Sequence, residues 1–179
     1  CDLLQVDILA LCCLRTARSG GESWVVSAET VHNIIREERP DLLEALYQSY
    51  NLDWRSEEPP GTDPWYTMPM FSVHDGILTS RLTSRVFVNS VTRHGEHLGA
   101  TPVQVEAAEF AQEVAQRPEL RLWMEFQEGD MQFINNLTTL HARNAFDDWP
   151  EPERRRHLLR LWIALDDARR RPLSPLLDD

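Results

Sequence analysis

The chain has 179 residues, a hydrophobic content of 42% and a formal net charge of −11. Its length suffices for one domain with a sizeable core. The acidic charge excludes nucleic acid as the main partner, because phosphate binding requires a basic surface. No apolar run approaches the roughly 18 residues of a membrane span. We therefore expect a protein that acts on a small molecule and has neither a nucleic-acid nor a membrane partner.

The first third of the chain predicts two strands followed by helices. Asp7–Arg15 and Ser23–Ser27 are strand-like runs joined by a turn at Gly20-Gly21. Ser27 is predicted to cap a helix, because its hydroxyl can accept a hydrogen bond from the first turn. Pro40 is expected to divide that helical stretch in two, since proline removes a helix hydrogen bond.

The middle of the chain predicts two inserted loops and a hairpin. Asn51–Pro64 is polar and fits either an active-site lid or a linker. Trp65–Phe71 and Ile77–Thr83 are predicted strands around a turn at His74-Asp75-Gly76. The second loop, Val91–Ala100, contains glycines and two histidines, whose spacing is weak evidence for a metal site.

A further helix and a second hairpin are predicted before the last strands. Thr101 is the expected helix cap, with proline in the next position, and Pro118 ends the helix. Leu122–Phe126 and Met131–Asn135 are predicted to pair as a hairpin. The arginine- and proline-containing tail after Asp166 fits a loose terminus or a homo-oligomer contact.

The cysteines point to a reducing compartment. Cys12 and Cys13 lie inside an apolar strand, and the three cysteines of the chain form neither a disulfide framework nor a zinc motif. We therefore expect buried thiols and a cytoplasmic location.

The last strands carry the main functional signal. His141 ends an apolar strand, and Arg156 and Arg160 lie on the next, where a spacing of four puts them on one face. Buried guanidinium groups require an anion. Either Glu128 and Asp130 provide internal salt bridges, or a small carboxylate binds to the planar fork of arginine. A lone histidine such as His141 is more often structural than a metal ligand.

Three segments in order carry a family resemblance: the strand Leu9–Arg15, the turn Ser19-Gly20-Gly21-Glu22-Ser23, and the strands with His141 and the two arginines. They resemble the C-terminal portion of the taurine dioxygenase-like (TauD/TfdA) family of Fe(II)- and 2-oxoglutarate-dependent oxygenases, over most of the chain. In that family a His-x-Asp motif precedes the first strand and a Gly-Gly-acid-Ser/Thr turn follows it. A Gly-Asp pair, the distal histidine and an arginine-bearing strand come last.

The resemblance implies roles for individual residues. His141 would be the distal iron ligand, and Arg156 would bind the remote carboxylate of 2-oxoglutarate with help from the Ser23 hydroxyl. Arg160 would face an acidic group of the substrate. Arg81, in the second strand of the predicted hairpin, either points into the barrel mouth towards an acidic substrate or is solvated.

The iron-binding carboxylate is expected at Asp2. Asp7 is the competing candidate, and Asp2 can also be read as a simple terminal acid. No histidine precedes the first strand in this sequence, so the missing iron ligand is expected immediately before Cys1. We accordingly expect an N-terminal part of the domain to lie outside the sequence.

The fold implied is mixed and mainly β: a double-stranded β-helix (jelly roll, cupin-like) with flanking α-helices, forming one incomplete domain over residues 1–179. The resemblance implies Fe(II), 2-oxoglutarate and dioxygen as cofactors and cosubstrates, and hydroxylation of a C–H bond as the reaction. Aromatic residues and arginines in the middle of the chain suggest an amino acid or other carboxylate as substrate. The alternative is a non-catalytic anion-binding jelly roll that lacks a complete iron triad.

Overall fold

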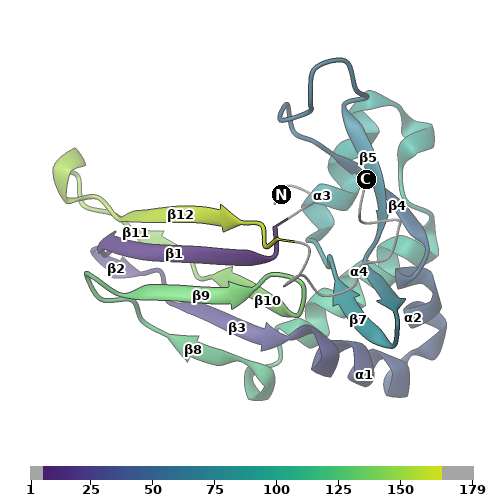
Figure 1. Cartoon of the computed structure of the whole chain (residues 1–179), viewed down its shortest axis with the longest axis horizontal. Coiled ribbons are helices and arrows are strands. Elements are labelled where there is room, and N and C mark those ends of the chain that lie inside the picture. The colour runs from purple at the N-terminus through teal and green to yellow at the C-terminus, as the bar shows by residue number, and fades with distance from the viewer. Residues whose placement is uncertain (1–5, 167–179) are drawn as a thin grey trace.

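The computed structural model describes residues 6–166 and is built around a central strand. β1 (Ile8–Arg15) pairs antiparallel with β12 (His157–Ile163) on one side and β9 (Met131–Asn135) on the other. Figure 1 shows these three strands side by side in one half of the molecule, with the helices in the other half. The long apolar β1 thus has a partner on each edge, which satisfies its backbone groups.

A second three-stranded sheet faces the first. Its order is β10 (Thr139–Arg143), β3 (Ser23–Ser27) and β8 (Leu122–Met124), all antiparallel. The Gln132 amide of β9 donates a hydrogen bond to the Met124 sulfur of β8, which joins the two layers. A short ribbon of β2 (Ser19–Gly20) and β11 (Phe146–Asp147) continues this side of the sandwich.

The predicted hairpin of Leu122–Phe126 with Met131–Asn135 is wrong. β8 pairs with β3 and β9 pairs with β1, so the two strands belong to different sheets. The turn at Gly129, which has a positive φ of 93°, is real. It carries the chain across from one sheet to the other. A turn can join two strands of one hairpin or two strands of different sheets. Burial in the folded protein decides between these arrangements, and the local sequence does not reveal it.

The helical half contains four α-helices, two hairpins and short 3₁₀ turns. The helices are α1 (Ala28–Glu38), α2 (Pro40–Leu46), α3 (Arg85–Ser90) and α4 (Pro102–Ala115). The hairpins are β4 (Ser49–Asp53) with β5 (Trp65–Pro69), and β6 (Phe71–His74) with β7 (Ile77–Ser80). Three 3₁₀ turns among the described residues are Val91–His94, Glu96–Leu98 and Pro118–Leu120, and a fourth, Pro152–Arg154, precedes β12 at the far end of the sheets (Figure 1). No helix in the described part of the chain is both long and apolar enough to span a membrane.

Most of the predicted helix signals are confirmed. The Ser27 hydroxyl accepts a hydrogen bond from the Thr30 amide, and Pro40 begins α2. Thr101 forms a full capping box with Gln104 at the start of α4. These caps satisfy backbone amides in the first turns of α1 and α4.

The two predicted middle loops contain some regular secondary structure. Asn51–Asp53 belongs to β4, so the Asn51–Pro64 loop is shorter than expected. Val91–Ala100 contains two 3₁₀ turns. The run Trp65–Phe71 is two strands, because Pro69 ends β5 and Phe71 starts β6. The predicted turn around Asp75-Gly76 is confirmed as the β6–β7 hairpin.

The main hydrophobic core lies between the second sheet and the helices. Trp24 and Val26 of β3 meet Ile35 of α1, Leu46 of α2 and Leu52 of β4 there, all of them buried. The opposite face of β3 carries Ser23 and Val25 and looks towards the first sheet. Alternation along the strand therefore puts Ser23 and Val25 on the face opposite Trp24 and Val26.

The first sheet has an apolar outward face. Its large exposed side chains reach 62% exposure at Phe133, 63% at Leu161 and 67% at Met131. The inward face carries Arg160, which the register pairs with Leu11 of β1. Apolar side chains such as Leu9 and Ile134 share the inward face with Arg160, which reaches the first cavity.

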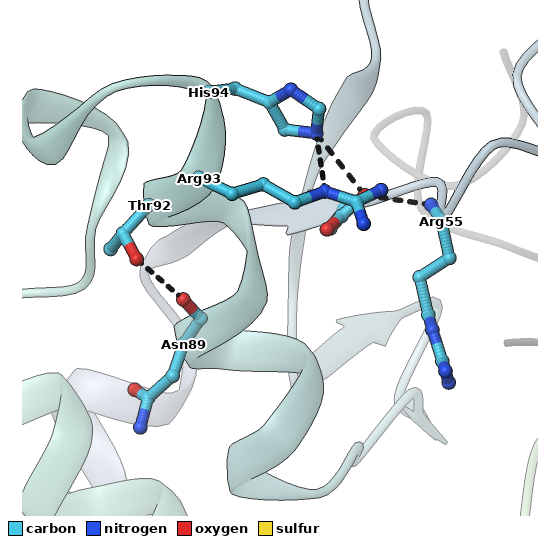
Figure 2. Close-up of polar contacts among 6 residues, drawn as sticks. Arg55, Asn89, Thr92, Arg93 and His94 are labelled. Carbon is cyan, nitrogen blue, oxygen red and sulfur yellow. Dashed lines mark hydrogen bonds and ion pairs between the residues drawn. The ribbon is translucent and has the colours of Figure 1, made fainter.

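A buried carboxylate ties β4 to the 3₁₀ turn after α3. Asp53 is fully buried. Its Oδ1 accepts hydrogen bonds from Arg93 Nη2 at 2.8 Å and the Arg55 amide at 2.7 Å, and lies 3.3 Å from His94 Nε2. Figure 2 shows Arg93, His94 and Arg55 converging around this group. Burial acts to raise the pKa of Asp53, but the hydrogen bonds and the Arg93 charge outweigh it, and the pKa is lowered overall.

Replacing Gly20 should destabilise the fold more than replacing Gly76. Both have positive φ, 72° and 75°, but a Cβ on Gly20 would lie 2.6 Å from the Ala145 carbonyl oxygen, whereas nothing lies within 4 Å at Gly76. We expect Gly20→Ala to lower the free energy of unfolding by about 2–3 kcal/mol and Gly76→Ala by about 1 kcal/mol. Urea denaturation measures both. Equal losses would contradict the close approach at Gly20.

Asp53→Asn should reduce the acid sensitivity of folding. A carboxyl whose pKa is lowered in the folded state stabilises the protein above its unfolded pKa, and that contribution is lost as the pH falls through the folded pKa. The variant should be less stable near pH 7 and lose less stability below about pH 4. Urea denaturation across this range tests it, with Asp63→Asn on the exposed loop as control. Parallel pH curves for wild type and Asp53→Asn would refute the role of this cluster.

Candidate functional site

A cavity of about 390 Å³ opens between the two sheets and the helical half. Its walls combine apolar side chains from the core, such as Trp24, Leu52 and Met68, with polar groups from the strands. His141 reaches it from β10 and Arg160 from β12, so the facing sheets each supply one of the predicted site residues. Sheet packing is what brings together two residues that lie 19 positions apart in the sequence.

The charge of this cavity is opposite to that of the protein. Among the described residues that line it, the basic side chains are Arg81, His141 and Arg160, and none is Asp or Glu. The whole chain carries 29 acidic residues and a net charge of −11. A cationic cavity in an acidic protein attracts and holds anions. Arg81 lines the same cavity, and its contact with an acidic substrate stays a prediction.

His141 and Ser23 lie on the same side of the second sheet. The register pairs His141 with Val25 and Arg143 with Ser23. Because side chains two residues apart share a face, the Ser23 hydroxyl lies on the face that carries the imidazole. Ser23 is buried, whereas His141 is exposed at the cavity. An accessible imidazole beside a sheltered hydroxyl suits a site that binds a ligand from solution.

Arg156 lies immediately before β12, next to the Gly20-Gly21 turn. Its guanidinium stands over the Phe146 ring at 5.3 Å, and its backbone amide donates to Asp148 Oδ1 at 2.8 Å. A Cβ on Gly21 would lie 3.4 Å from Arg156 Nε, so the glycine leaves room for the arginine side chain. The turn signal and the arginine, 135 positions apart, therefore form one local structure.

The Arg156 side chain is half-buried and has no acidic partner within residues 6–166. The predicted alternative of a salt bridge to Glu128 or Asp130 is not seen; Asp130 Oδ2 accepts a hydrogen bond from the Gln127 amide instead, at 2.8 Å. Burial, followed by the nearby charge of Arg143, lowers the pKa of Arg156. A partly desolvated cation beside a second cation favours the binding of an anion.

Arg156 borders a second cavity, of about 430 Å³, rather than the one with His141. Cys13 of β1 and Gly21 line it as well. Burial raises the pKa of the Cys13 thiol, so this cysteine is a neutral wall residue. The predicted residues thus fall into two groups: Arg81, His141 and Arg160 at the first cavity, and Arg156 beside the turn that leads to Ser23.

Asp2 and Asp7 are the two candidate iron-binding carboxylates, and the structure describes only the second. Asp2 lies outside the described residues. Asp7 is buried, its Oδ2 accepts a hydrogen bond from the Leu165 amide at 2.8 Å, and it borders a third cavity that His141 does not line. Asp7 therefore has a structural role at the junction of β1 with the segment after β12. Between residues 6 and 166, no three His, Cys, Asp or Glu side chains are grouped closely enough to hold a metal ion.

The described residues therefore suit 2-oxoglutarate better than they suit iron. Arg156, with the Gly21 turn and Ser23, matches what a carboxylate of 2-oxoglutarate requires: a planar cation and a hydroxyl in a sheltered place. For iron, the described residues offer the His141 imidazole, and the carboxylate must come from outside residues 6–166. Imidazole and carboxylate together suit Fe(II).

Sequence reasoning missed the polar side chains that α4 contributes. Gln112 and Gln116 line the first cavity together with Asn136 and Thr139. The two glutamines are four residues apart and hence on one helix face, which was visible in the sequence. What was not visible is that this end of the helix reaches the space between the sheets.

The chain matches the taurine catabolism dioxygenase TauD, TfdA family over residues 4–162. It is 40% identical over 172 residues to FR-33289 synthase of Streptomyces rubellomurinus (strain ATCC 31215), covering 94% of this chain and 50% of that protein. It is 35% identical to a taurine hydroxylase-like protein of Stachybotrys chartarum (89% and 40% covered) and 29% identical to a uridine-5′-phosphate dioxygenase of Amycolatopsis sp (91% and 57%). The chain spans about half the length of these relatives.

Solved structures share the fold. An asparagine oxygenase in complex with Fe(II), 2S,3S-3-hydroxyasparagine and succinate superposes with a TM-score of 0.65 at 15% identity, covering 91% of this chain and 47% of that chain. AAD-2 in complex with Mn(II) and N-oxalylglycine gives 0.63 at 12% identity, covering 90% and 64%. The expected mainly β jelly roll with flanking helices is thereby confirmed. Since the family match spans nearly all of the strands described above, the chain belongs to the taurine catabolism dioxygenase TauD, TfdA family.

Proposed function

We propose that this chain is the part of an Fe(II)- and 2-oxoglutarate-dependent dioxygenase that binds the cosubstrate and hydroxylates a C–H bond of a small anionic substrate. The observation that carries the proposal is the half-buried Arg156 without an acidic partner in the described chain, beside the Gly20-Gly21 turn. Family membership and the placement of His141 at the cationic cavity support it.

His141 and Asp2 are the proposed iron ligands of this chain. His141 stands on a paired strand, so its position is fixed by the β3–β10 register. When bound, iron supplies the activation of dioxygen with 2-oxoglutarate as the electron donor. The role of the chain is to present the imidazole and to hold the reactants in fixed positions.

Arg156 is the proposed anchor of the remote carboxylate of 2-oxoglutarate. Its guanidinium can donate two parallel hydrogen bonds to that group, and the Ser23 hydroxyl can donate a third. The pKa of Arg156 is lowered by burial, but an arginine stays charged at neutral pH. The Phe146 ring against the guanidinium limits its movement. This arrangement fixes the direction in which the cosubstrate points.

Arg160 and Arg81 are the proposed contacts of the anionic group of the substrate. Arg160 is held over the Trp162 ring at 4.6 Å and reaches the same cavity as His141. The apolar wall with Trp24 and Met68 suits an uncharged body. Two relatives are named for taurine, which is a sulfonate, and for uridine 5′-phosphate. We therefore propose a carboxylate, sulfonate or phosphate on the substrate, which is broader than the amino acid or other carboxylate expected from the sequence.

The proposal includes cytoplasmic action, on the grounds of the free thiols of Cys12 and Cys13. No structural observation favours the non-catalytic anion-binding alternative. That alternative rested on the lack of a histidine before the first strand in this sequence.

Loss of the Arg156 side chain should abolish tight cosubstrate binding. On the full-length gene product without oxygen, Fe(II) and 2-oxoglutarate should give the weak visible charge-transfer band of the chelate. Arg156→Ala should raise the concentration of 2-oxoglutarate at half-saturation on the order of 100-fold, because two charge-assisted hydrogen bonds are lost. His141→Ala should remove the band. Arg154→Ala, an exposed neighbour stacked on Trp149, is the control and should behave like wild type. A wild-type protein without the band would refute the proposed function.

Ser23→Ala should weaken 2-oxoglutarate binding by about 10-fold without loss of stability beyond about 1 kcal/mol, since one hydrogen bond is removed. Ser27→Ala is the matched control on the same strand. It removes the cap of α1 and should cost about 1 kcal/mol of stability while leaving 2-oxoglutarate binding unchanged. The same titration and urea denaturation separate the two effects. Unchanged binding in Ser23→Ala would remove Ser23 from the cosubstrate site.

A further inference from the structure

Arg143 and Arg156 stand against the same aromatic ring. Arg143 ends β10 of the second sheet, and Arg156 immediately precedes β12 of the first. Their Cζ atoms lie 4.3 Å and 5.3 Å from the centre of the Phe146 ring, within the range of cation–π contacts. After burial, the charge of Arg143 is the next cause of the lowered pKa of Arg156. Phe146 therefore brings two cations from different sheets close enough to repel each other.

The carboxylates around this pair are engaged elsewhere. In the part of the chain that the structure describes, no ion pair joins Arg143 or Arg156 to an acidic side chain. Glu22 Oε2 accepts a hydrogen bond from Asn144 Nδ2 at 3.2 Å, and Asp148 Oδ1 accepts one from the Arg156 backbone amide at 2.8 Å. Arg143 Nη1 donates to the Asn144 carbonyl oxygen at 3.1 Å, which is a neutral and local contact. An anion from solution can therefore bind to both guanidinium groups.

Arg143 is also the cross-strand partner of Ser23. The register of β10 with β3 places these two residues directly opposite each other. Side chains of such a pair share one face, and their Cβ atoms lie about 5 Å apart. An arginine side chain spans this separation, so a group bound to the Ser23 hydroxyl is within reach of Arg143. Arg156 approaches from the other side, where its Nε lies 3.4 Å from the place of a Cβ on Gly21.

We propose that Arg143 is a further cosubstrate-binding residue, which holds the remote carboxylate of 2-oxoglutarate together with Arg156 and Ser23. This inference rests on the proposed function and adds a residue to the cosubstrate site. One anion between two guanidinium groups offsets their repulsion and accepts charge-assisted hydrogen bonds from both. Because Arg143 is exposed and Arg156 half-buried, solvent weakens the contribution of Arg143 more, and its share should be the smaller one.

The test titrates 2-oxoglutarate into the full-length protein with Fe(II) under anaerobic conditions and follows the charge-transfer band. Arg143→Ala and Arg143→Gln should each raise the concentration at half-saturation about 10-fold, because a charged donor is lost. Arg143→Gln keeps the first part of the aliphatic stem and serves if the alanine variant does not fold. Arg143→Lys should bind more tightly than the glutamine variant, since it retains the positive charge. Arg154→Ala, which removes an exposed arginine stacked on Trp149, is the matched control and should behave like wild type.

A second measurement excludes an indirect effect through the neighbouring iron ligand. Arg143 lies two residues after His141, so calorimetry records the Fe(II) dissociation constant of each variant without 2-oxoglutarate. That constant should be unchanged. Without the band in wild type, the proposed function and this inference both fall.

Three results overturn the inference alone when wild type shows the band and Arg156→Ala weakens 2-oxoglutarate binding. The first is wild-type half-saturation in the Arg143 variants. The second is a loss of Fe(II) affinity by the same factor as the loss of 2-oxoglutarate affinity, which would mean that Arg143 only supports the strand of His141. The third is equal binding by the lysine and glutamine variants, which would mean that the charge has no part in binding.

Discussion

The antiparallel pairing of β1 with β12 is the constraint on which the site depends. It places Arg160 opposite Leu11 on the inward face and Leu161 opposite Ala10 on the outward face. A slip of one residue would exchange these faces and put the arginine outside. Arg160 reaches the cavity because this register is held without interruption over six pairs, from Ile8 with Ile163 to Cys13 with Leu158. The second sheet then only has to face the first for His141 to meet Arg160.

The site also depends on how the two faces of β3 are oriented. One face, with Trp24 and Val26, joins the core formed with the helices. The other face bears Ser23 and Val25 and borders the space between the sheets. The helical half therefore supports the site from behind, while α4 reaches around to one wall with Gln112 and Gln116. Trp24 belongs both to the core and to the wall of the first cavity, so one side chain of β3 contributes to stability and to the site.

Much of the fold could be predicted from the sequence, because its signals are local. The caps Ser27 and Thr101 and the helix break at Pro40 all lie where propensity and turn chemistry put them. The pairing of Leu122–Met124 could not be predicted, since it depends on a partner strand about a hundred residues away. Local patterns specify elements, whereas the choice of partner is made by burial in three dimensions.

The candidate site was predictable in part. The residue types and their order identified His141, Arg156 and Arg160 through a family resemblance, and the structure adds where each one lies. The spacing of residues in the sequence did not predict that Arg156 borders a separate cavity beside Gly21. It also did not predict that α4 contributes to the first cavity. Asp7 illustrates the opposite case. As a candidate ligand it was plausible by sequence, but its carboxylate is occupied by the Leu165 amide.

Because His141 and Arg160 lie on facing sheets, ligand binding between them is linked to the stability of the native state. A pocket assembled from two layers does not exist in any partly unfolded state in which the layers have separated. Whatever binds across it stabilises the native state by mass action and not the unfolded chain. The supply of metal and small molecules would then set how much of the polypeptide escapes proteolysis, so nutrient status and protein abundance become thermodynamically linked.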